Sequence, residues 1–318
     1  MKLLVVTVNY RTAEVVLRAL PRTLEDLEGI DSKLVIVDND SGEFELLRDA
    51  VRDGGFGDRV EVIAAERNGG FGYGNNVAIR RALASDDPPD YVYLLNPDAY
   101  PSPGAIPTLV EFLDRHANVG IVGSRLHEPD GRRHPSAFRF PSVLGELERG
   151  LRLGFVTKML DNWAVWTLAP TETKPVDWVS GASAMFRREV FETVGLFDEN
   201  FFLYFEETDL CRRAKRAGWP TWYCHESVVE HIQGVATGIT DVRRPVPGYW
   251  FDSRRYYFLK QGGRRELWMA NAAFIASFSL WRVRRKIQGK PDDDPPRLLG
   301  DFVRHNVLRN SARPSTRA

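Results

Sequence analysis

The chain has little cysteine, no excess of charge of either sign and no long apolar run. Its two cysteines, Cys211 and Cys224, have neither the spacing of metal ligands nor a reason to be oxidised, so we expect both to be reduced and buried, as in a cytosolic protein. Lysine and arginine together number 43, as do aspartate and glutamate, so the formal charge is zero. A balanced charge disfavours a general nucleic-acid binder.

The start of the chain predicts a strand and no signal peptide. Met1 and Lys2 lead into LLVVTVNY, a short β-branched run that is followed by Arg11 and not by a cleavage site. With 318 residues, the chain is long enough to bury a large core in one domain, or in a domain plus an extension.

Strands and helices are predicted to alternate through the first hundred residues. The predicted elements after the first strand are a helix at 12–28, a strand at 33–37, a helix at 43–52, a strand at 60–64, a helix at 72–84 and a strand at 91–95. This rhythm is typical of a parallel sheet with helices on its faces. Ligands of such sheets bind beyond the carboxyl ends of the strands.

Polar residues follow four consecutive predicted strands. They are Thr7, Asn9 and Tyr10, then Asp38, Asn39, Asp40 and Ser41, then Asn68, and finally Asn96 and Asp98. Any one group is typical of an ordinary turn, whereas all four, together with an acidic helix start at 206–209, favour a ligand site. The glycines of GGFGYGNN allow a ligand to approach the backbone closely. A dinucleotide fingerprint would instead follow the first strand, where TVNYRT stands, so a nicotinamide enzyme is not expected.

Three carboxylates, Glu206, Glu207 and Asp209, follow the aromatic run FFLYF and open a helix that is predicted to reach about Ala217. Acids in a first helical turn are favoured by the helix dipole, which explains one or two of them. Apolar surroundings raise the pKa of a carboxylate and make it a better proton acceptor near neutral pH. The pattern therefore predicts acid/base work beside a bound sugar.

Several separated motifs resemble those of the inverting family 2 glycosyltransferases, in particular a bacterial rhamnosyltransferase-like branch. They are SGA before RR, GLFDENFF, YFEETDLC and AGW, and the resemblance spans residues 3 to about 238. It implies an α/β fold of the GT-A type, with a mainly parallel central sheet flanked by helices. The implied glycosyltransferase domain is 1–240, with a donor half at about 1–125 and an acceptor half at about 126–240. A helical, basic extension at 241–318 would follow.

The resemblance also implies roles for individual residues. The base falls on Glu207, a glutamate where aspartate is commoner, and Glu206 and Asp209 remain rivals for the role. The implied donor-binding residues are Thr7, Asn9, Tyr10, Asp38, Asn39, Asn68, Gly70, Gly72, Asn76 and Asn96. The implied acceptor-binding residues are Trp178, Ser180, Gly181 and Ala182, with core packing an equally weighted alternative for Trp178. Asp98 and His231 would hold a metal, with Asn96 standing where a simpler family site has aspartate.

The implied activity is metal-dependent, inverting transfer of a sugar from a nucleotide diphosphate donor, dTDP- or UDP-linked, with Mn²⁺ or Mg²⁺ as cofactor. dTDP-rhamnose is the predicted donor. The predicted acceptor is a hydroxyl of a glycan or of a polyprenyl-diphosphate-linked glycan in cell-envelope polysaccharide synthesis. The alternatives are a glycan- or nucleotide-binding relative without catalysis, and a nucleotidyltransferase. The latter should carry a glycine- and basic-rich signature after the first strand, and the sequence has none there.

Two further segments carry predictions. Residues 144–172 are predicted to form a mobile connection that covers the acceptor, and 250–260 to dock on the catalytic domain with Arg254 or Arg255 facing a phosphate. Leu267, Phe274, Phe278 and Trp281 recur at helical spacing before RVRRK, which predicts an amphipathic helix lying on the anionic cytoplasmic face of a membrane. About fifteen apolar-leaning residues are too few to span a bilayer. The alternative is a helix that packs on the protein or on another subunit of a homo-oligomer.

Overall fold

The computed structural model describes residues 1–165, 170–232 and 243–308, which divide into two compact units. Of the described residues, unit 1 holds 1–138, 170–199 and 206–232, and unit 2 holds 139–165, 200–205 and 243–308. Unit 2 therefore takes in two segments that precede residue 240. The domain boundary expected from the sequence stays a prediction.

Unit 1 is built around one mixed sheet and a small two-stranded ribbon. The strands of the large sheet are β1 Leu3–Asn9, β2 Ser32–Asp38, β3 Val60–Ala64, β4 Tyr91–Leu95, β5 Ala99–Pro101, β6 Ile121–His127, β7 Arg133–His134, β9 Lys174–Val176, β11 Ser183–Arg187 and β12 Thr221–His231. The ribbon pairs β8 Ala137–Phe138 with β10 Trp178–Val179. The helices are α1 Ala13–Asp26, α2 Phe44–Asp53, the short η1 Gly57–Arg59, α3 Gly70–Leu83, α4 Ala105–Arg115, α7 Arg188–Val194 and α8 Glu206–Arg216.

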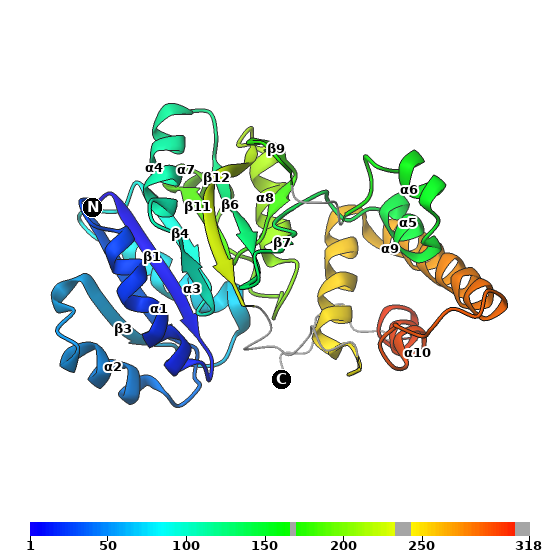
Figure 1. The fold of residues 1–318 in the computed structure, drawn as a ribbon, viewed down its shortest axis with the longest axis horizontal. Helices are drawn as coiled ribbons and strands as arrows, with labels where there is room; N and C mark the ends of the chain where they lie inside the picture. The colour runs from blue at the N-terminus through cyan, green and yellow to red at the C-terminus, as the bar shows by residue number, and fades with distance from the viewer. Residues whose placement is uncertain (166–169, 233–242, 309–318) are drawn as a thin grey trace. The chain divides into compact units, whose positions relative to one another are not determined.

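The sheet order explains how one edge collects residues from distant parts of the chain. Along the main path the order is β3-β2-β1-β4-β11-β6-β12-β5, and β1 to β4 are paired in parallel. β11 runs antiparallel to β4, with Ser183 opposite Leu95. The beginning of β11 therefore lies at the edge where β1, β2 and β4 end (Figure 1).

Buried strands and amphipathic helices build this unit as the sequence predicts. β4 is buried along its whole length, as is expected of a central strand covered on both faces. The predicted strands at 33–37, 60–64 and 91–95 are confirmed within one residue at each end. The helix predicted at 72–84 begins at Gly70, so part of the glycine cluster lies in its first turn.

Unit 2 is helical. Its elements are α5 Val143–Leu151, α6 Gly154–Met159, α9 Gly248–Ile287, α10 Leu298–Val303 and the π-helical η2 Arg304–Leu308. The segment predicted to be a mobile connection, 144–172, contains the helices α5 and α6, and residues 166–169 lie outside the described ranges. Its mobility and its cover of the acceptor stay predictions. Ser142 begins α5 by accepting the backbone N–H of Gly145 at 3.1 Å, which satisfies one free donor of the first turn.

α9 consists of two helical parts. Gly262 and Gly263 interrupt it with non-helical torsions, and Gly263 has a φ of 70° that few other residues adopt. α5 packs along α9, although about a hundred residues of sequence separate them. Figure 1 shows the green α5 beside the yellow-to-orange α9.

The apolar face expected to lie on a membrane is buried instead. The side chains of Leu267, Phe274 and Phe278 are only 7%, 3% and 2% exposed, and they pack against other apolar residues of unit 2. The packing alternative is therefore the correct one for this face. Within the described residues, every helix is too short or too polar to cross a bilayer.

Arg254 also departs from its predicted role. Its guanidinium is fully buried in unit 2, where Nη2 lies 3.0 Å from Glu146 Oε2. Nη1 donates to Asn271 Oδ1 and to Asn306 Oδ1, each at 2.8 Å. The predicted contact of Arg254 with a phosphate was made from the sequence, in which the carboxylate and the two amides that enclose Arg254 could not be recognised as its partners.

Candidate active site

Asn9 joins the ends of β1 and β2. Its Nδ2 donates to Asp38 Oδ1 at 2.9 Å, to Ser41 Oγ at 3.2 Å and to Glu43 Oε2 at 3.1 Å. Its Oδ1 accepts from the backbone N–H and the hydroxyl of Thr12 at 3.1 and 2.9 Å. These contacts hold the Asp38 carboxylate at the carboxyl edge of the sheet, where the sequence predicts the nucleotide.

Non-glycine residues with left-handed torsions follow both of these strands. Arg11 has a φ of 57° and Asp40 a φ of 58°. Such residues cost on the order of 1–3 kcal/mol each and concentrate at functional sites. Thr7 is buried near the end of β1, and Tyr10 lies half-buried just after it.

A second amide connects this edge to the glycine-rich turn. Asn39 Nδ2 donates to Asn68 Oδ1 at 3.1 Å and to the carbonyl of Gly70 at 3.2 Å. Asn68 Oδ1 also accepts the backbone N–H of Gly70 at 3.2 Å. The structure therefore brings Asn39, Asn68 and Gly70 together, as the donor-site prediction requires.

Asp98 and His231 meet where β5 pairs with the end of β12. His231 lies opposite Ala99 in this pairing, and His231 Nε2 is 3.2 Å from Asp98 Oδ1. Asn96 Nδ2 lies 3.5 Å from the same ring nitrogen. The three residues predicted to surround a metal are thus neighbours. The second ring nitrogen of His231, Nδ1, is buried with no hydrogen-bond partner in the structure.

These residues fit a divalent ion that takes further ligands from elsewhere. Two adjacent ligands of an octahedral ion with bonds of about 2.0–2.1 Å lie roughly 3 Å apart, close to the separation of Asp98 and His231. One carboxylate and one imidazole form a donor set that suits Mn²⁺. Within the described ranges, no cluster of three or more His, Cys, Asp or Glu side chains is placed to hold a metal. The diphosphate of a donor would have to supply the remaining oxygens.

The predicted acceptor strip, Ser180 to Ala182, lies next to both the metal residues and the acidic helix. The carbonyl of Ala182 accepts the backbone N–H of Asn96 at 3.0 Å. The backbone N–H of Gly181 donates to the carboxylate of Glu207. A side chain at Gly181 would come within 2.9 Å of the Phe71 ring, so glycine is needed for this close approach.

Glu207 has the environment of a general base. Its Oε2 is buried without a hydrogen-bond partner in the structure. Burial raises the pKa of Glu207 to about 7, although the backbone N–H groups of Glu207, Gly181 and Thr208 favour the carboxylate. The preceding residues Tyr204 and Phe205 both have a positive φ, 70° and 71°, so the turn into α8 is strained.

The two rival acids occupy different surroundings. Asp209 is fully buried, and its Oδ2 accepts from Arg213 Nε at 2.8 Å. Arg213 also donates to the carbonyls of Val194 and Leu196, so this ion pair ties α8 to the loop before it. Glu206 is 2% exposed and begins α8 beside Gly72. These positions favour Glu207 as the acid that is available for proton transfer.

Asn76 and Gly72 lie on α3 and face the loop that precedes α8. Asn76 Nδ2 donates to the carbonyl of Phe197 and to Glu199 Oε1, both at 2.9 Å, and its Oδ1 accepts the Phe197 N–H at 3.1 Å. A methyl group at Gly72 would lie 3.0 Å from Phe197 Cβ. The contacts of Asn76 are those of a residue that positions this loop, and its predicted contact with the donor stays a prediction.

Trp178 is half-buried and stacks on Phe138, with ring centroids 4.2 Å apart and planes inclined by 21°. Both residues belong to the ribbon of β8 and β10. One face of the indole is therefore used in packing, and the acceptor role of Trp178 stays a prediction.

Two residues at the site were missed by the sequence analysis. Glu43 Oε2 accepts from Asn9 Nδ2 and from the backbone N–H of Ala13, each at 3.1 Å, and its place at the start of α2 after the Asp38 turn was the available signal. His134 lies beside His231, with ring centroids 6.1 Å apart. Burial lowers the pKa of His134 to about 4, with a smaller contribution from His231, so the imidazole is neutral above that pH. Its motif, HPSAF, was visible in the sequence.

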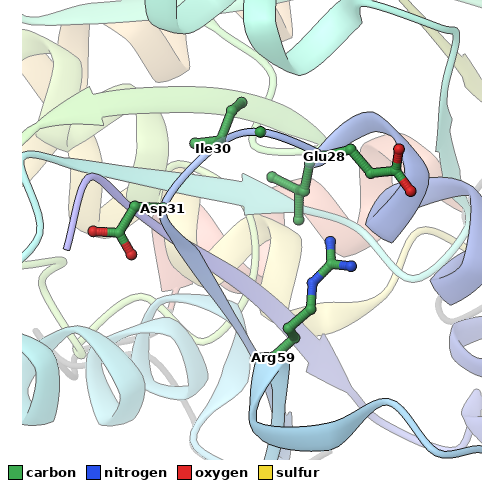
Figure 2. Close-up of a pocket in the computed structure, with 6 residues that line it drawn as sticks. Glu28, Ile30, Asp31 and Arg59 are labelled. Carbon is green, nitrogen blue, oxygen red and sulfur yellow. The ribbon is translucent and has the colours of Figure 1, made fainter.

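A pocket of about 500 Å³ lies away from this site. It is lined by Leu27, Glu28, Gly29, Ile30, Asp31 and Arg59. Figure 2 shows Arg59, from the turn before β3, near the turn that precedes β2. Both turns lie at the amino ends of their strands, opposite the edge that holds Asp38. We assign the pocket no part in the site.

The mixed sheet is flanked by helices, and its carboxyl edge gathers Asp38, Asp98 and a glycine-rich helix start next to the half-buried Glu207. This is the fold of the GT-A glycosyltransferases. The chain belongs to glycosyltransferase family 2, because the family model described as glycosyltransferase like family 2 matches residues 2–244.

Three relatives show which members of the family the chain is similar to. The chain is 35% identical over 158 residues to the N-acetylglucosaminyl-diphospho-decaprenol L-rhamnosyltransferase of Mycobacterium tuberculosis, a match that covers 47% of this chain and 49% of that protein. It is 28% identical over 155 residues to the rhamnosyltransferase WbbL of Escherichia coli, covering 47% and 55%. It is 27% identical over 231 residues to a low-salt glycan biosynthesis hexosyltransferase of Haloferax volcanii, covering 73% and 67%. The match thus spans about half the length of the two rhamnosyltransferases.

Solved structures agree on the fold. A mannosyltransferase from Pyrobaculum calidifontis in complex with GDP-Man and Mn²⁺ superposes with a TM-score of 0.56 at 14% identity, covering 97% of this chain and 86% of that one. TarS of S. aureus in complex with UDP-GlcNAc superposes with a TM-score of 0.55 at 14% identity, covering 96% and 81%. At this identity the likeness shows the fold and not the substrate.

Proposed function

We propose that the protein is a metal-assisted, inverting glycosyltransferase that moves a sugar from a nucleotide diphosphate donor to an acceptor hydroxyl. The observation that carries the proposal is the Glu207 carboxylate, which is enclosed at the start of α8, contacted by the Gly181 N–H and raised in pKa to about 7. A base with this pKa is about half ionised at neutral pH, which suits proton transfer there.

The proposed reaction is a single displacement. Glu207 accepts the proton of the acceptor hydroxyl while that oxygen attacks the anomeric carbon of the donor sugar. The bond between the anomeric carbon and the nucleoside diphosphate breaks on the opposite face, so the configuration inverts. Ser180 to Ala182 would line the acceptor side, because this strip contacts Glu207 through Gly181 and Asn96 through Ala182.

The donor would lie along the edge formed by Asp38, Asn39 and the Asn68–Gly70 turn. The Asp38 carboxylate suits an imide N–H of a pyrimidine base or a ribose hydroxyl. Asp98 and His231 would hold Mn²⁺ or Mg²⁺, which, when bound, stabilises the negative charge on the leaving diphosphate. Asn96 adds a neutral amide at the same place, so among the described residues Asp98 is the carboxylate beside His231.

We further propose dTDP-rhamnose as donor and a polyprenyl-diphosphate-linked sugar as acceptor, in cell-envelope polysaccharide synthesis. Support comes from the name of the relative from Mycobacterium tuberculosis, which transfers L-rhamnose to N-acetylglucosaminyl-diphospho-decaprenol. The acceptor has to be tested directly, since this match covers about half of each chain.

The proposal is tested by thermal shift and product formation with dTDP-rhamnose, UDP-GlcNAc and GDP-mannose, each with and without Mn²⁺, for the protein and for Asp98→Ala and Glu207→Gln. We expect one nucleotide sugar to raise the Tm with Mn²⁺ present, since a ligand that binds only the folded state stabilises it. Asp98→Ala should abolish the Mn²⁺-dependent part of the shift. Glu207→Gln should keep the shift and lose turnover by about 10²–10⁴-fold, the usual contribution of a general base.

The exposed carboxylate of Asp53 on α2 provides the control. Asp53→Ala should behave as the unmodified protein does. Donor binding without any transfer or hydrolysis, unchanged by Glu207→Gln, would show instead a binding protein that has lost catalysis. Failure of every nucleotide sugar to shift the Tm would overturn the donor site itself.

A further inference from the structure

The second part of α9, from Arg264 to Ile287, has a second apolar face that is exposed. Trp268, Ala272, Ala276, Leu280, Val283 and Ile287 follow one another at intervals of three or four residues and are all exposed. Residues at this spacing lie on one face of a helix. Trp268, Leu280 and Ile287 are 71%, 60% and 80% exposed, and the stripe is about 28 Å long at 1.5 Å per residue.

This exposed stripe is distinct from the face that packs inside unit 2. Leu267, Phe274 and Phe278, which the sequence suggested for membrane contact, lie on the opposite side of the helix and are buried. The helix is therefore apolar on two sides, although a helix that only covers a core needs one apolar side. A stripe of large apolar side chains left in water requires an explanation.

Positive charge accompanies the exposed stripe. Arg265 and Lys286 lie on the same face near its two ends, since Arg265 precedes Trp268 by three residues and Lys286 follows Val283 by three. Arg264 and Arg282 are exposed along one border. Glu266 is the single acidic residue in the sequence between 264 and 291. Of the acids that follow, Asp292 pairs with Arg285 and Asp294 with Arg152.

We propose that this stripe, Arg265 to Ile287, docks the protein on an anionic lipid surface. Large apolar side chains and basic residues on one helix face are the combination by which a helix lies in the interface of a bilayer. The apolar side chains would enter the headgroup region while Arg265 and Lys286 contact lipid phosphates. Docking through this stripe would not depend on the transfer reaction.

A second copy of this chain is the competing occupant, and the charges disfavour it. Stacking two such faces would bring the arginines and lysines of both copies together, with Glu266 as the single acid of the segment on each side. Like charges that face each other across an interface oppose association. An anionic leaflet complements the same charges.

The test is co-sedimentation of the full chain with vesicles of phosphatidylcholine alone and of phosphatidylcholine with phosphatidylglycerol, at 50 mM and 500 mM salt. We expect binding to the anionic vesicles at low salt, and weaker binding at high salt because salt screens the cations. The double variant Arg265→Glu with Lys286→Glu should lose at least about tenfold in affinity, since each cation near an anionic surface contributes roughly fivefold. Val283→Glu with Ile287→Glu should lose binding with the cations intact.

Matched controls come from the exposed surface of α2, where Leu46 and Arg52 are 51% and 64% exposed. The pair Leu46→Glu with Arg52→Glu should bind vesicles as the unmodified protein does, and all variants should keep its Tm. The proposal is wrong if the unmodified protein does not sediment with anionic vesicles, or if the control pair loses as much binding as the α9 variants. A dimer in light scattering that Val283→Glu with Ile287→Glu converts to a monomer, without vesicle binding, would assign the stripe to self-association.

Discussion

At the scale of single residues, stability and catalysis favour opposite protonation states of Glu207. Burial raises its pKa to about 7, so the folded protein binds a proton more tightly than the unfolded chain between pH 4.5 and 7. A raised carboxylate pKa means that the folded state loses stability as the pH rises through this window. The ionised base that catalysis requires is therefore the less stable form of the site.

Glu207→Gln should accordingly remove activity and increase stability. Above pH 7 the free energy of unfolding should rise, by at most roughly 3 kcal/mol, because a neutral amide replaces a buried carboxylate. Near pH 4.5 the gain should vanish, since the carboxyl is then neutral in the folded protein. Urea unfolding at pH 5 and pH 8 measures the free energy of unfolding of the variant and of the unmodified protein under the two conditions. The exposed Glu111→Gln serves as control, and an equal gain at the two pH values would contradict the assignment.

The activity of the unmodified protein should depend on the protonation state of Glu207. Turnover should fall about tenfold per pH unit once the pH drops below about 7, because the protonated Glu207 accepts no proton. The pH profile of kcat with saturating donor checks this. A profile that stays flat down to pH 5 would exclude Glu207 as the base.

Asn76 tests whether a predicted donor-binding residue is in fact a positioning residue. Its amide makes three hydrogen bonds to the backbone of Phe197 and to Glu199. Asn76→Ala should lower stability by roughly 2–3 kcal/mol and reduce kcat, because the loop before α8 loses its attachment to α3. The Kd of the donor, measured by calorimetry, should change less than threefold. A large rise in Kd at unchanged stability would restore the donor contact that the sequence predicts.

At the scale of elements, a buried charged group attaches α9 to α5. The Arg254 guanidinium lies against Glu146 and donates to the amides of Asn271 and Asn306. Removing one partner of a buried ion pair costs about 3–5 kcal/mol, because the other charge is left without compensation. Arg254→Met should therefore destabilise the protein by that amount in urea unfolding.

The double variant separates this structural role from phosphate binding. Arg254→Met with Glu146→Leu should recover much of the lost stability, since both charges are then absent. Donor affinity should be unchanged in each variant that folds. If Arg254→Met left stability intact and weakened donor binding, the contact with phosphate that the sequence suggests would be correct.

The elements that the sequence predicts well are those that a short stretch of residues determines. LLVVTVN and YVYLL are apolar throughout, and both form the buried strands expected of them. The acids of α8 and its end near Ala217 were also predictable, because helix-start acids and the following Gly218 are local signals. The three acids could be singled out because they follow an aromatic run, whereas the choice of Glu207 among them came from the family resemblance.

Pairings between distant segments explain where the sequence analysis was wrong. Arg254 pairs with Glu146, which lies 108 residues earlier in the sequence. Hydrophobic periodicity also does not show which of the two apolar faces of α9 is covered by a neighbouring helix. Leu267 and Phe278 looked suited to a membrane because α5, the helix that packs along α9, was assigned to a mobile connection over the acceptor. Tertiary packing determines which apolar face of α9 is buried, as it commonly does for helices with more than one apolar side.

At the scale of the whole molecule, the two compact units are interleaved in the sequence. Phe201 lies between two segments of unit 1, yet its side chain is buried in unit 2 with Tyr257, Phe258 and Leu267 of α9. Val143 of α5 packs on the same cluster. A cut after residue 240 would therefore remove the partners of residues that remain in the chain.

A protein ending at residue 240 should fold less well than the full chain. Loss of α9 leaves Phe201 and Val143 without the apolar neighbours that cover them, at a cost of roughly 3–5 kcal/mol for side chains of this size. We expect a lower Tm and binding of the dye ANS, whereas a chain ending at residue 308 keeps every described contact of unit 2 and should match the full protein. If the 240-residue protein melted at the same temperature and bound the donor equally well, 1–240 would be an independent domain, as the sequence predicts. The expected result means instead that α9 supports the segment leading into α8, so that a disturbance of the helical unit reaches the candidate base through the chain itself.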